Sequence, residues 1–338
     1  MQWLWRSLTT EESATDGLAG RETRLLLPGT GFRIQRRARP RLLARSASGR
    51  PFARGDSSVT DRNLISGIDQ NEFIKSYLSK NKPLVSRGCF PGAEQPDSPW
   101  NLDLLARRFG NCHVPVFDSL FEMQQTVKFS DYASTIHDER SDEEPVPYMR
   151  WYARQRHFQM IRADKAFAEM ADSWAAPSWL PSENYVFPPI ERNADPVRDS
   201  FPAKGIFVCA AGGRTRLHVD PWASDAVLCQ AFGEKRFVMY PPSAAEFLSD
   251  GESVIDLEHP DNVRFPRWRS ISPTVAVTLS PGDAIFIPSG WFHAAVALTP
   301  SVSVTWNFVH EVNADRFAAY LEAGGSTDPT VRYFQGSR

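Results

Sequence analysis

Residues 279–293 read Leu279-Ser280-Pro281-Gly282-Asp283-Ala284-Ile285-Phe286-Ile287-Pro288-Ser289-Gly290-Trp291-Phe292-His293. Pro281-Gly282-Asp283 is a turn signal that precedes a strand, and Pro288-Ser289-Gly290 is a second turn signal that ends it. The apolar run between the two turns has the length of a buried β-strand. The stretch therefore predicts two successive strands, with His293 at the head of the second.

Short apolar runs of the same kind continue on both sides of this stretch, from about residue 205 onward. Eight strands are expected, over Ile206–Cys209, Arg216–Val219, Ala226–Phe232, Arg236–Tyr240, Val275–Leu279, Ala284–Ile287, Ala294–Leu298 and Val302–Phe308. Short strands separated by turn signals are typical of a barrel or sandwich, including a double-stranded jelly roll. The predicted fold is mainly β, a double-stranded β-helix (jelly-roll or cupin) barrel with its core at about residues 205–309.

The rest of the chain predicts helices around this barrel, on its N-terminal side and in a short C-terminal segment. Helices are expected to open at Asp69–Glu72 and to cover Leu102–Phe109, 148–172 and Ala314–Ala323. Residues 1–62 show little hydrophobic periodicity, which predicts a poorly ordered or loosely packed extension. The predicted division is therefore an extension over 1–62, a barrel-containing domain over 63–312, and a C-terminal helix and tail over 313–338.

Composition and charge bear on the expected partners and location. The chain has 338 residues and a net charge of -2, which gives no clear signal for a nucleic-acid or anionic-membrane partner. No run approaches the ~20 apolar residues of a membrane span. Its four cysteines form no C-x-x-C pair, which favours a reducing compartment. The expected location is the cytoplasm, or the nucleus if the organism is a eukaryote.

His218 and Asp220 stand two residues apart in a predicted strand. Side chains at i and i+2 of a strand point to the same face, so both can reach one point inside a barrel. A lone His-x-Asp is a weak signal, because such short matches arise by chance. His293 supplies a third ligand if the barrel sheet brings it beside Asp220. Two imidazoles and one carboxylate make the facial triad of non-haem Fe(II) oxygenases, which leaves positions open for a keto acid and O2.

Lys235 leads a strand that is expected to lie next to the predicted metal strand. An oxygenase that uses 2-oxoglutarate needs a cation for the carboxylate far from the metal. An inward lysine in an apolar barrel is costly without an anionic partner, so an inward Lys235 would imply such a ligand. Spacing alone also allows an exposed lysine at the end of the strand.

These residues resemble the Jumonji-C (cupin-like) family of Fe(II)/2-oxoglutarate-dependent oxygenases, over roughly residues 70–312. Four motifs occur in the family's order and spacing: Thr215-Arg216-Leu217-His218-Val219-Asp220-Pro221, Gly233-Glu234-Lys235-Arg236, residues 282–293, and Val304-Thr305-Trp306-Asn307-Phe308. Four ordered motifs are far more specific than any one, and they favour the inward position of Lys235. Within the family the chain looks most like the small protein-hydroxylase branch, which includes the bifunctional arginine demethylase and lysyl hydroxylase and the asparaginyl hydroxylase.

The resemblance implies a role for each matching position. His218, Asp220 and His293 match the iron ligands, and Lys235 matches the residue that pairs with the C5 carboxylate of 2-oxoglutarate. Contacts with the cosubstrate, or a place near the metal, are implied for Thr305, Thr215, Tyr152 and Asn307, with Tyr148 as a rival to Tyr152. Two departures bear on substrate choice and cosubstrate affinity, Leu228 in place of asparagine and Trp306 in place of a polar residue.

The implied activity is hydroxylation of a carbon in a side chain of a protein or peptide, with Fe(II), 2-oxoglutarate and O2. Alternatives are N-methyl demethylation, modification of a tRNA nucleoside, and a non-catalytic cupin-like binding module. The binding module is disfavoured because the chain keeps all three metal ligands. A cupin metalloenzyme that does not use 2-oxoglutarate is disfavoured because it would not need Lys235. The sequence leaves a homodimer open.

The mouth of the pocket is expected to be framed by Arg214, Arg216 and Trp222 on one side and by Trp151 and Tyr152 from a preceding helix on the other. Aromatic faces can hold a cationic or aliphatic side chain, and they can equally form a methyl-ammonium cage. Arginines can grip carboxylates or carbonyl groups of a substrate. A simpler interpretation is that these aromatic residues pack the flank of the barrel.

Overall fold

The structure is a computed structural model that describes residues 64–65, 67–90, 93, 95, 97–137, 146–153, 162–189 and 204–335. Contacts divide the chain into two units, residues 1–50 and 51–338, and all of the described residues belong to the second unit. The predicted extension over residues 1–62 lies outside the described residues. Its division from the rest of the chain stays a prediction.

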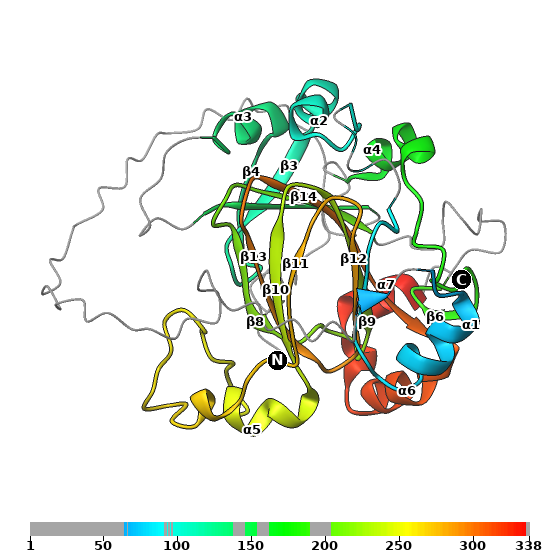
Figure 1. Cartoon of the computed structure of the whole chain (residues 1–338), viewed down its shortest axis with the longest axis vertical. Coiled ribbons are helices and arrows are strands. Elements are labelled where there is room, and N and C mark those ends of the chain that lie inside the picture. The colour runs from blue at the N-terminus through cyan, green and yellow to red at the C-terminus, as the bar shows by residue number, and fades with distance from the viewer. Residues whose placement is uncertain are drawn as a thin grey trace, which may run out of the picture. The chain divides into compact units, whose positions relative to one another are not determined.

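The described residues form two β-sheets (Figure 1). The larger has ten strands in the order β1-β2-β12-β9-β14-β7-β5-β3-β4, with β6 paired to β14, and the smaller has the order β11-β10-β13-β8. Their bounds are β1 (Leu64–Ile65), β2 (Leu84–Ser86), β3 (His113–Phe117), β4 (Met123–Lys128), β5 (Tyr148–Tyr152), β6 (Tyr185–Phe187), β7 (Gly205–Cys209), β8 (Arg214–His218), β9 (Asp225–Phe232), β10 (Lys235–Tyr240), β11 (Val275–Leu279), β12 (Ala284–Ile287), β13 (Phe292–Ala297) and β14 (Ser301–His310). Within the described part of the chain, the pairing of β1 with β2 is parallel and the others are antiparallel.

The mainly β prediction is confirmed, and the eight strands expected from residue 205 onward are β7 to β14. Each predicted boundary lies within two residues of the observed one. Strand β11 alternates buried and half-buried residues, as expected of a strand with one covered face, whereas every residue of β12 is buried. Alternation, turn residues and apolar runs were therefore sufficient to locate strands β7 to β14 in the sequence. Closure of the two sheets into a jelly-roll barrel stays a prediction.

Short helices flank the sheets, and the longest described helix has nine residues. They are α1 (Gln70–Phe73), which continues as a π-helix over Ile74–Leu78, α2 (Leu102–Phe109), α3 (Phe129–Ser134), α4 (Asp164–Glu169), α5 (Ala245–Leu248), α6 (Ala314–Glu322) and α7 (Pro329–Gln335). A helix begins where the sequence predicted one, and Asp69 caps α1 by accepting a hydrogen bond from the Glu72 amide at 2.8 Å. None of the described helices is both long and apolar enough to span a membrane.

The helix predicted over residues 148–172 is wrong in its first part, which forms β5. Met149 and Trp151 point into the main apolar cluster, and Tyr148, Arg150 and Tyr152 point to the opposite face. A strand is identified by apolar residues that recur with a period of two. Here aromatic residues lie on both faces, so this period is not visible in the sequence. Residues 164–169 do form a helix, α4, and residues 154–161 lie outside the described residues.

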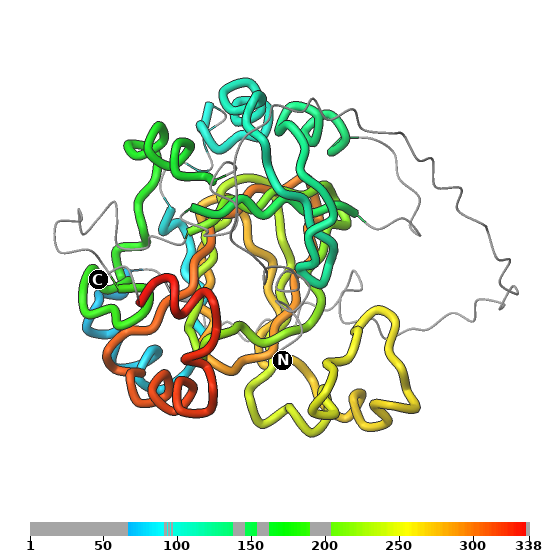
Figure 2. Tube along the Cα trace, turned by 180° about the vertical axis from the view of Figure 1, so that it is seen from behind, coloured from blue at the N-terminus to red at the C-terminus, as the bar shows by residue number. Residues whose placement is uncertain are grey.

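The apolar core lies on both faces of the larger sheet. One cluster has members on strands of both sheets, including Leu228 of β9 and Phe237 of β10, and so fills the space between them. A larger cluster covers the other face, where Phe73 of α1 packs on Phe286 of β12 with ring centroids 4.9 Å apart. Segments from opposite ends of the described chain meet beside this sheet, since α1 lies beside α6 in both views (Figures 1 and 2). Arg316 of α6 donates to the Asn81 side chain at 2.6 Å.

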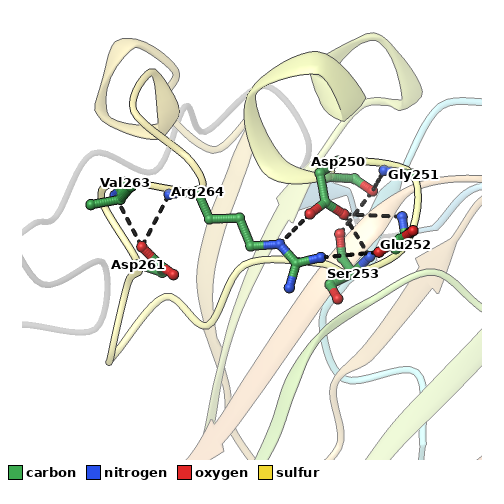
Figure 3. Close-up of polar contacts among 8 residues, drawn as sticks. Asp250, Gly251, Glu252, Ser253, Asp261, Val263 and Arg264 are labelled. Atoms are coloured by element: carbon green, nitrogen blue, oxygen red, sulfur yellow. Dashed lines mark hydrogen bonds and ion pairs between the residues drawn. The ribbon is translucent and has the colours of Figure 1, made fainter.

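The connection between β10 and β11 is long, spans residues 241–274 and includes α5. Figure 3 shows how its turns are held: Arg264 pairs with Asp250, and Asp250 also accepts a hydrogen bond from the Ser253 amide at 2.7 Å. These two partners lower the pKa of Asp250 to about 2. Asp261 accepts hydrogen bonds from the amides of two following residues at 3.0 Å. Aspartate side chains that accept hydrogen bonds from nearby backbone amides in this way hold the turns of a loop. The exposed ion pair between Arg264 and Asp250 adds little stability.

Candidate metal centre

Three side chains, His218, Asp220 and His293, lie close enough together to hold one metal ion. Their ligand atoms all lie within 4.8 Å of one another. Oδ1 of Asp220 is 3.5 Å from Nε2 of His218 and 3.7 Å from Nε2 of His293. Within the part of the chain that the structure describes, no other group of three His, Cys, Asp or Glu side chains has such spacing.

The pairing of β8 with β13 brings the two histidines together. His218 ends β8, and its partner across the ladder is His293, the second residue of β13. The next recorded pair joins Thr215 to Ala295, so β8 carries one extra residue between the two pairs. A β-bulge of this kind re-aims side chains. It allows Thr215 and His218 to face the larger sheet together, although three steps along a regular strand would separate them onto opposite faces.

Asp220 lies two residues beyond the end of β8, so its predicted place within the strand is wrong. Pro221 follows it, and Trp222 and Ala223 have positive φ values of 64° and 48°, which are uncommon for residues other than glycine. The chain therefore turns immediately after the carboxylate. Asn307 of β14 hydrogen-bonds this carboxylate, which places Asn307 beside the three candidate ligands.

Both histidines are oriented by the backbone. Nδ1 of His218 is 2.8 Å from the carbonyl oxygen of Arg216, and Nδ1 of His293 is 3.2 Å from that of Trp291. A carbonyl oxygen only accepts hydrogen bonds, so we assign the ring proton to Nδ1 in each case. The lone pair of each Nε2 is then free on the side of Asp220. This is the arrangement in which outer hydrogen bonds orient metal-binding imidazoles.

The charge states of His293 and Asp220 suit a divalent metal. Burial, aided by the neighbouring His218, lowers the pKa of His293 to about 4, so that this imidazole is neutral. Burial raises the pKa of Asp220, but His293, His218 and the hydrogen bond from Asn307 together lower this pKa by more than burial raises it. The pKa of Asp220 is therefore below its usual value, and the carboxylate is ionised. Metal ions bind neutral imidazole and ionised carboxylate. The donor set therefore fits a metal such as Fe(II).

Lys235 is buried at the start of β10, with 1% of its surface exposed, and does not lie on the outside of the strand. Its Nζ donates to the Tyr148 hydroxyl at 2.9 Å and to the Ser303 hydroxyl at 2.6 Å. Burial lowers the pKa of Lys235 to about 8, with Cys209 opposing the shift and the positive charge of Arg150 adding to it. The ammonium group is still mainly charged at neutral pH. Its pairing with a bound carboxylate stays a prediction.

The two candidate tyrosines lie at different ends of β5. Tyr148 bonds Lys235, whereas the ring of Tyr152 contacts the Phe207 ring, with centroids 5.3 Å apart. Burial, opposed by Arg150 and reinforced by Asp220, raises the pKa of the Tyr152 hydroxyl. Tyr152 thus lies toward the metal ligands and Tyr148 toward the lysine. Had β5 been recognised as a strand, the period of two would have placed both tyrosines on the inner face.

Thr215, Thr305 and Leu228 lie along the same interior, whereas Trp306 does not. Thr215 accepts a hydrogen bond from Arg150 at 3.3 Å, and Thr305 donates to the carbonyl oxygen of Val227 at 3.0 Å. Leu228 pairs with Thr305 across β9 and β14 and belongs to the apolar cluster between the sheets. Trp306 is buried in the cluster on the other face of the larger sheet. That explains an apolar residue at 306, because its side chain faces the core.

Sequence reasoning missed a polar network that continues from Lys235. Ser303 donates to the Gln230 side-chain oxygen at 2.9 Å, and the amide nitrogen of Gln230 donates to the Ser301 hydroxyl at 3.0 Å. Ser303 lies two residues before Thr305 on β14, so the period of two could have found it. The network satisfies polar groups that would otherwise be costly to bury.

The expected frame of the pocket mouth is wrong at Trp151, and its two arginines form ion pairs. Arg214 pairs with Glu258, and Arg216 pairs with Asp256 at 3.2 Å, so both arginines tie β8 to the long connection between β10 and β11. Trp151 lies in the main apolar cluster, because β5 turns its side chain to the other face of the sheet. These long-range pairings left no signal in the local sequence.

Asp225 supports the turn that precedes His293. It is fully buried, accepts a hydrogen bond from the Ser289 amide at 2.9 Å, and accepts another from the Asn313 side chain at 2.8 Å. Burial raises the pKa of Asp225 to about 6 from a usual value of 3.8, against the lowering effect of these two hydrogen bonds. The ionised form is therefore less favourable in the folded protein than in the unfolded chain.

This shift predicts a pH-dependent effect of Asp225→Asn. A carboxyl group whose pKa is raised by folding lowers the free energy of unfolding as the pH rises from about 4 to about 6. The free energy of unfolding of the wild type should therefore fall by on the order of 3 kcal/mol relative to that of the variant. Urea unfolding of both proteins between pH 4 and pH 7 measures this difference. A difference that is the same at every pH would contradict the expectation.

Comparison with known proteins shows one family and several relatives. The family described as "Cupin-like domain" matches residues 70–314. The chain is 23% identical to the chicken (Gallus gallus) protein named 2-oxoglutarate and iron-dependent oxygenase JMJD4, over 80% of this chain and 64% of that protein. It is 27% identical to lysine-specific demethylase JMJ21 of Arabidopsis thaliana, over 73% of this chain and 25% of that protein. It is 25% identical to tRNA wybutosine-synthesizing protein 5 of Danio rerio, over 79% of this chain and 80% of that protein.

The chain spans less than two thirds of the length of the chicken and Arabidopsis relatives. All three matches cover most of this chain, and their names include an oxygenase, a demethylase and a tRNA-modifying protein. The resemblance to the Jumonji-C (cupin-like) family found in the sequence is thereby confirmed.

Proposed function

The chain belongs to the cupin-like domain family, and on that premise we propose that it is an Fe(II)- and 2-oxoglutarate-dependent oxygenase. The observation that carries the proposal is the group of His218, Asp220 and His293, in which both Nε2 atoms lie within 3.7 Å of one carboxylate oxygen. In this proposal Fe(II), when bound, supplies the activation of O2 that oxidises a C–H bond of the substrate. The chain's own residues hold the metal, orient the cosubstrate and exclude water.

The residues proposed to hold the metal and to orient the cosubstrate come from three strands. His218 and Asp220 come from β8 and the turn after it, His293 comes from β13, and Lys235 comes from β10. Strands β7, β9, β12 and β14 lie in the larger sheet in the order β12-β9-β14-β7, and strands β8, β10, β11 and β13 lie in the smaller sheet in the order β11-β10-β13-β8. Eight antiparallel strands shared in this way between two facing sheets suit a jelly roll. We therefore propose that the candidate metal centre lies inside such a roll.

We propose that the substrate is a protein or peptide side chain, hydroxylated at carbon. A demethylase would be favoured by an aromatic cage at the metal, but Trp151 is in the core and Trp222 packs on the Phe187 ring at 5.6 Å. Two of the three aromatic residues that the sequence offered for a cage are therefore engaged elsewhere, and of the three Tyr152 alone lies on the metal side. His218 and Asp220 are partly exposed, with 18% and 15% of their side-chain surfaces accessible, so a side chain can approach them.

Hydroxylation and demethylation leave different products, which allows a direct test. We expect unmethylated peptides to gain the mass of one oxygen atom in the presence of Fe(II), ascorbate and 2-oxoglutarate. Matched methylated peptides should show no preferential turnover. Intact-mass measurement follows the peptides, and a formaldehyde assay runs beside it. Consumption of the methylated set alone, with formaldehyde released in proportion to succinate, would show that hydroxylation is the wrong assignment.

The two tyrosines can be ranked by a matched pair of variants. Tyr148→Phe removes the hydroxyl that accepts from Lys235 at 2.9 Å. A hydrogen bond to a charged group contributes about 1.5–3 kcal/mol, so we expect KM for 2-oxoglutarate to rise roughly tenfold to a hundredfold. Tyr152→Phe is the control, because no hydrogen bond links its hydroxyl to Lys235. A larger increase in KM for Tyr152→Phe would reverse this order.

A further inference from the structure

Strand β5 presents a row of three inward side chains, Tyr148, Arg150 and Tyr152, that share one face of the strand. At one end, Tyr148 bonds Lys235. At the other end, Tyr152 is near enough to Asp220 for their charges to interact. Arg150 therefore lies between the buried lysine and the candidate metal ligands.

Arg150 is a buried cation that forms no ion pair with another described residue. Its exposed fraction is 0%, and no carboxylate among the described residues lies within ion-pair distance of it. Its two terminal nitrogens donate to the carbonyl oxygen of Asp118 at 2.8 Å and to the Thr215 hydroxyl at 3.3 Å, and its Nε has no hydrogen-bond partner. A buried charge without a partner is costly. Its retention therefore points to an anionic ligand.

Aromatic rings fix the plane of this guanidinium group. Its central carbon lies 4.1 Å from the centroid of the Phe121 ring and 4.3 Å from that of Tyr148. The Phe121 ring also lies 4.9 Å from that of His218, which connects Arg150 to the metal side of the site. Phe121 has a positive φ of 66°, which a bulky residue adopts only where its surroundings hold it. The group is thus held in one orientation before any ligand binds.

Lys235 is a second buried cation in the same interior, and its polar contacts are to the neutral hydroxyls of Tyr148 and Ser303. The charge of Arg150 lowers the pKa of Lys235, so the two groups are near enough to repel each other. The charge of Asp118 favours the cationic form of Arg150, but the two side chains form no ion pair, and no described carboxylate acts on Lys235. Two buried cations that form no ion pair with a described side chain suit an anionic group as their ligand.

We propose that Arg150 is a specificity-determining residue that, together with Lys235, binds the carboxylate of the cosubstrate that lies away from the metal. The inference rests on the proposed use of 2-oxoglutarate and adds the residue that selects a keto acid with two carboxylates. A carboxylate has two oxygens with several lone pairs, so one oxygen can accept from Nζ of Lys235 and the other from Arg150. A keto acid that ends in a methyl group would leave both cations unpaired.

Binding in the absence of turnover tests this role. The full chain is loaded with Zn(II) in place of iron, and calorimetry measures its affinity for 2-oxoglutarate and for 2-oxopentanoate, which has a methyl group in place of the far carboxylate. We expect wild type to prefer 2-oxoglutarate. Arg150→Gln keeps side-chain hydrogen bonding but removes the charge, and should reduce that preference roughly tenfold to a hundredfold. Arg150→Lys keeps the charge and should keep most of the preference.

Lys204→Met is the matched control, because Lys204 is also buried and lies 5.0 Å from the ring centroids of Phe167 and Trp174. Its loss should leave the preference unchanged. Circular dichroism and thermal unfolding establish whether each variant is folded. If Arg150→Gln does not fold, Arg150→Lys provides the test, because loss of the preference for 2-oxoglutarate in Arg150→Lys would overturn the role of the charge. A folded Arg150→Gln that retains the preference overturns the inference alone. A wild type without any preference for 2-oxoglutarate overturns the proposed function instead.

Discussion

Asp220→Ala is expected to abolish turnover while leaving the fold intact. The carboxylate is the one anionic ligand among the three, and its Oδ1 lies within 3.7 Å of both imidazole nitrogens. Loss of a residue that only orients a ligand costs about 10–100-fold in metal affinity or activity, so loss of the ligand itself should cost more. Within the described residues, no spare His, Cys, Asp or Glu completes the group. Succinate production measures the effect, and His218→Ala should behave in the same way.

The control for this variant is Asp250→Ala, which removes an acidic residue from the connection between β10 and β11. Its partner Arg264 is exposed, so its removal should change neither metal binding nor turnover. Circular dichroism establishes that both variants are folded, and metal titration separates loss of iron from loss of chemistry. Near-normal succinate production by a folded Asp220→Ala protein would exclude the triad as the catalytic metal site.

Lys235→Met is expected to raise KM for 2-oxoglutarate by about a hundredfold or more, with little change in iron affinity. Loss of one partner of a buried charge pair costs roughly 3–5 kcal/mol. The methionine fills much of the same space, so packing is nearly kept. Steady-state kinetics with varied 2-oxoglutarate measure KM, and a metal titration measures iron binding.

The pKa of Lys235 adds a signature to this variant. The pKa lies at about 8, below the usual value of 10.5, because the side chain is buried. The lysine is charged below that pH and loses its proton above it, so KM for 2-oxoglutarate should rise by up to about tenfold per pH unit above pH 8. The profile of Lys235→Met should lack this rise. Arg236→Met, a change of the next residue on the strand, is the control and should resemble wild type. An unchanged KM for Lys235→Met would exclude Lys235 from cosubstrate binding.

The sequence was most informative where local signals agree with one another. Strands β7 to β14 are separated by turns such as Pro281-Gly282-Asp283, and their apolar residues follow a period of two or form continuous buried runs. Those signals are local, so they can be identified without knowing the partners of each strand. The three candidate metal ligands were recognised because they lie within such motifs. Their assembly depends on pairing that only the structure shows.

The sequence was least informative for β5 and for everything that β5 positions. Its five residues place aromatic side chains on both faces, and a helix is a reasonable interpretation of such a run. In a helix, the side chains of Tyr148, Arg150 and Tyr152 would point in different directions around the axis. In the strand, all three point to one face. Arg150 was therefore missed, and the choice between the two tyrosines stayed open. The ion pairs of Arg214 and Arg216 were missed because their partners lie about 40 residues away.

The partnership of His218 with His293 across β8 and β13 has a consequence for biosynthesis. During synthesis on the ribosome, β8 emerges well before β13, and four other strands of the fold lie between them in the chain. Contacts between such distant segments form late in folding, because a long loop must close first. A nascent chain with only His218 and Asp220 offers two ligands and would hold iron weakly. Capture of the metal is thereby delayed until the sheets that protect it have been assembled.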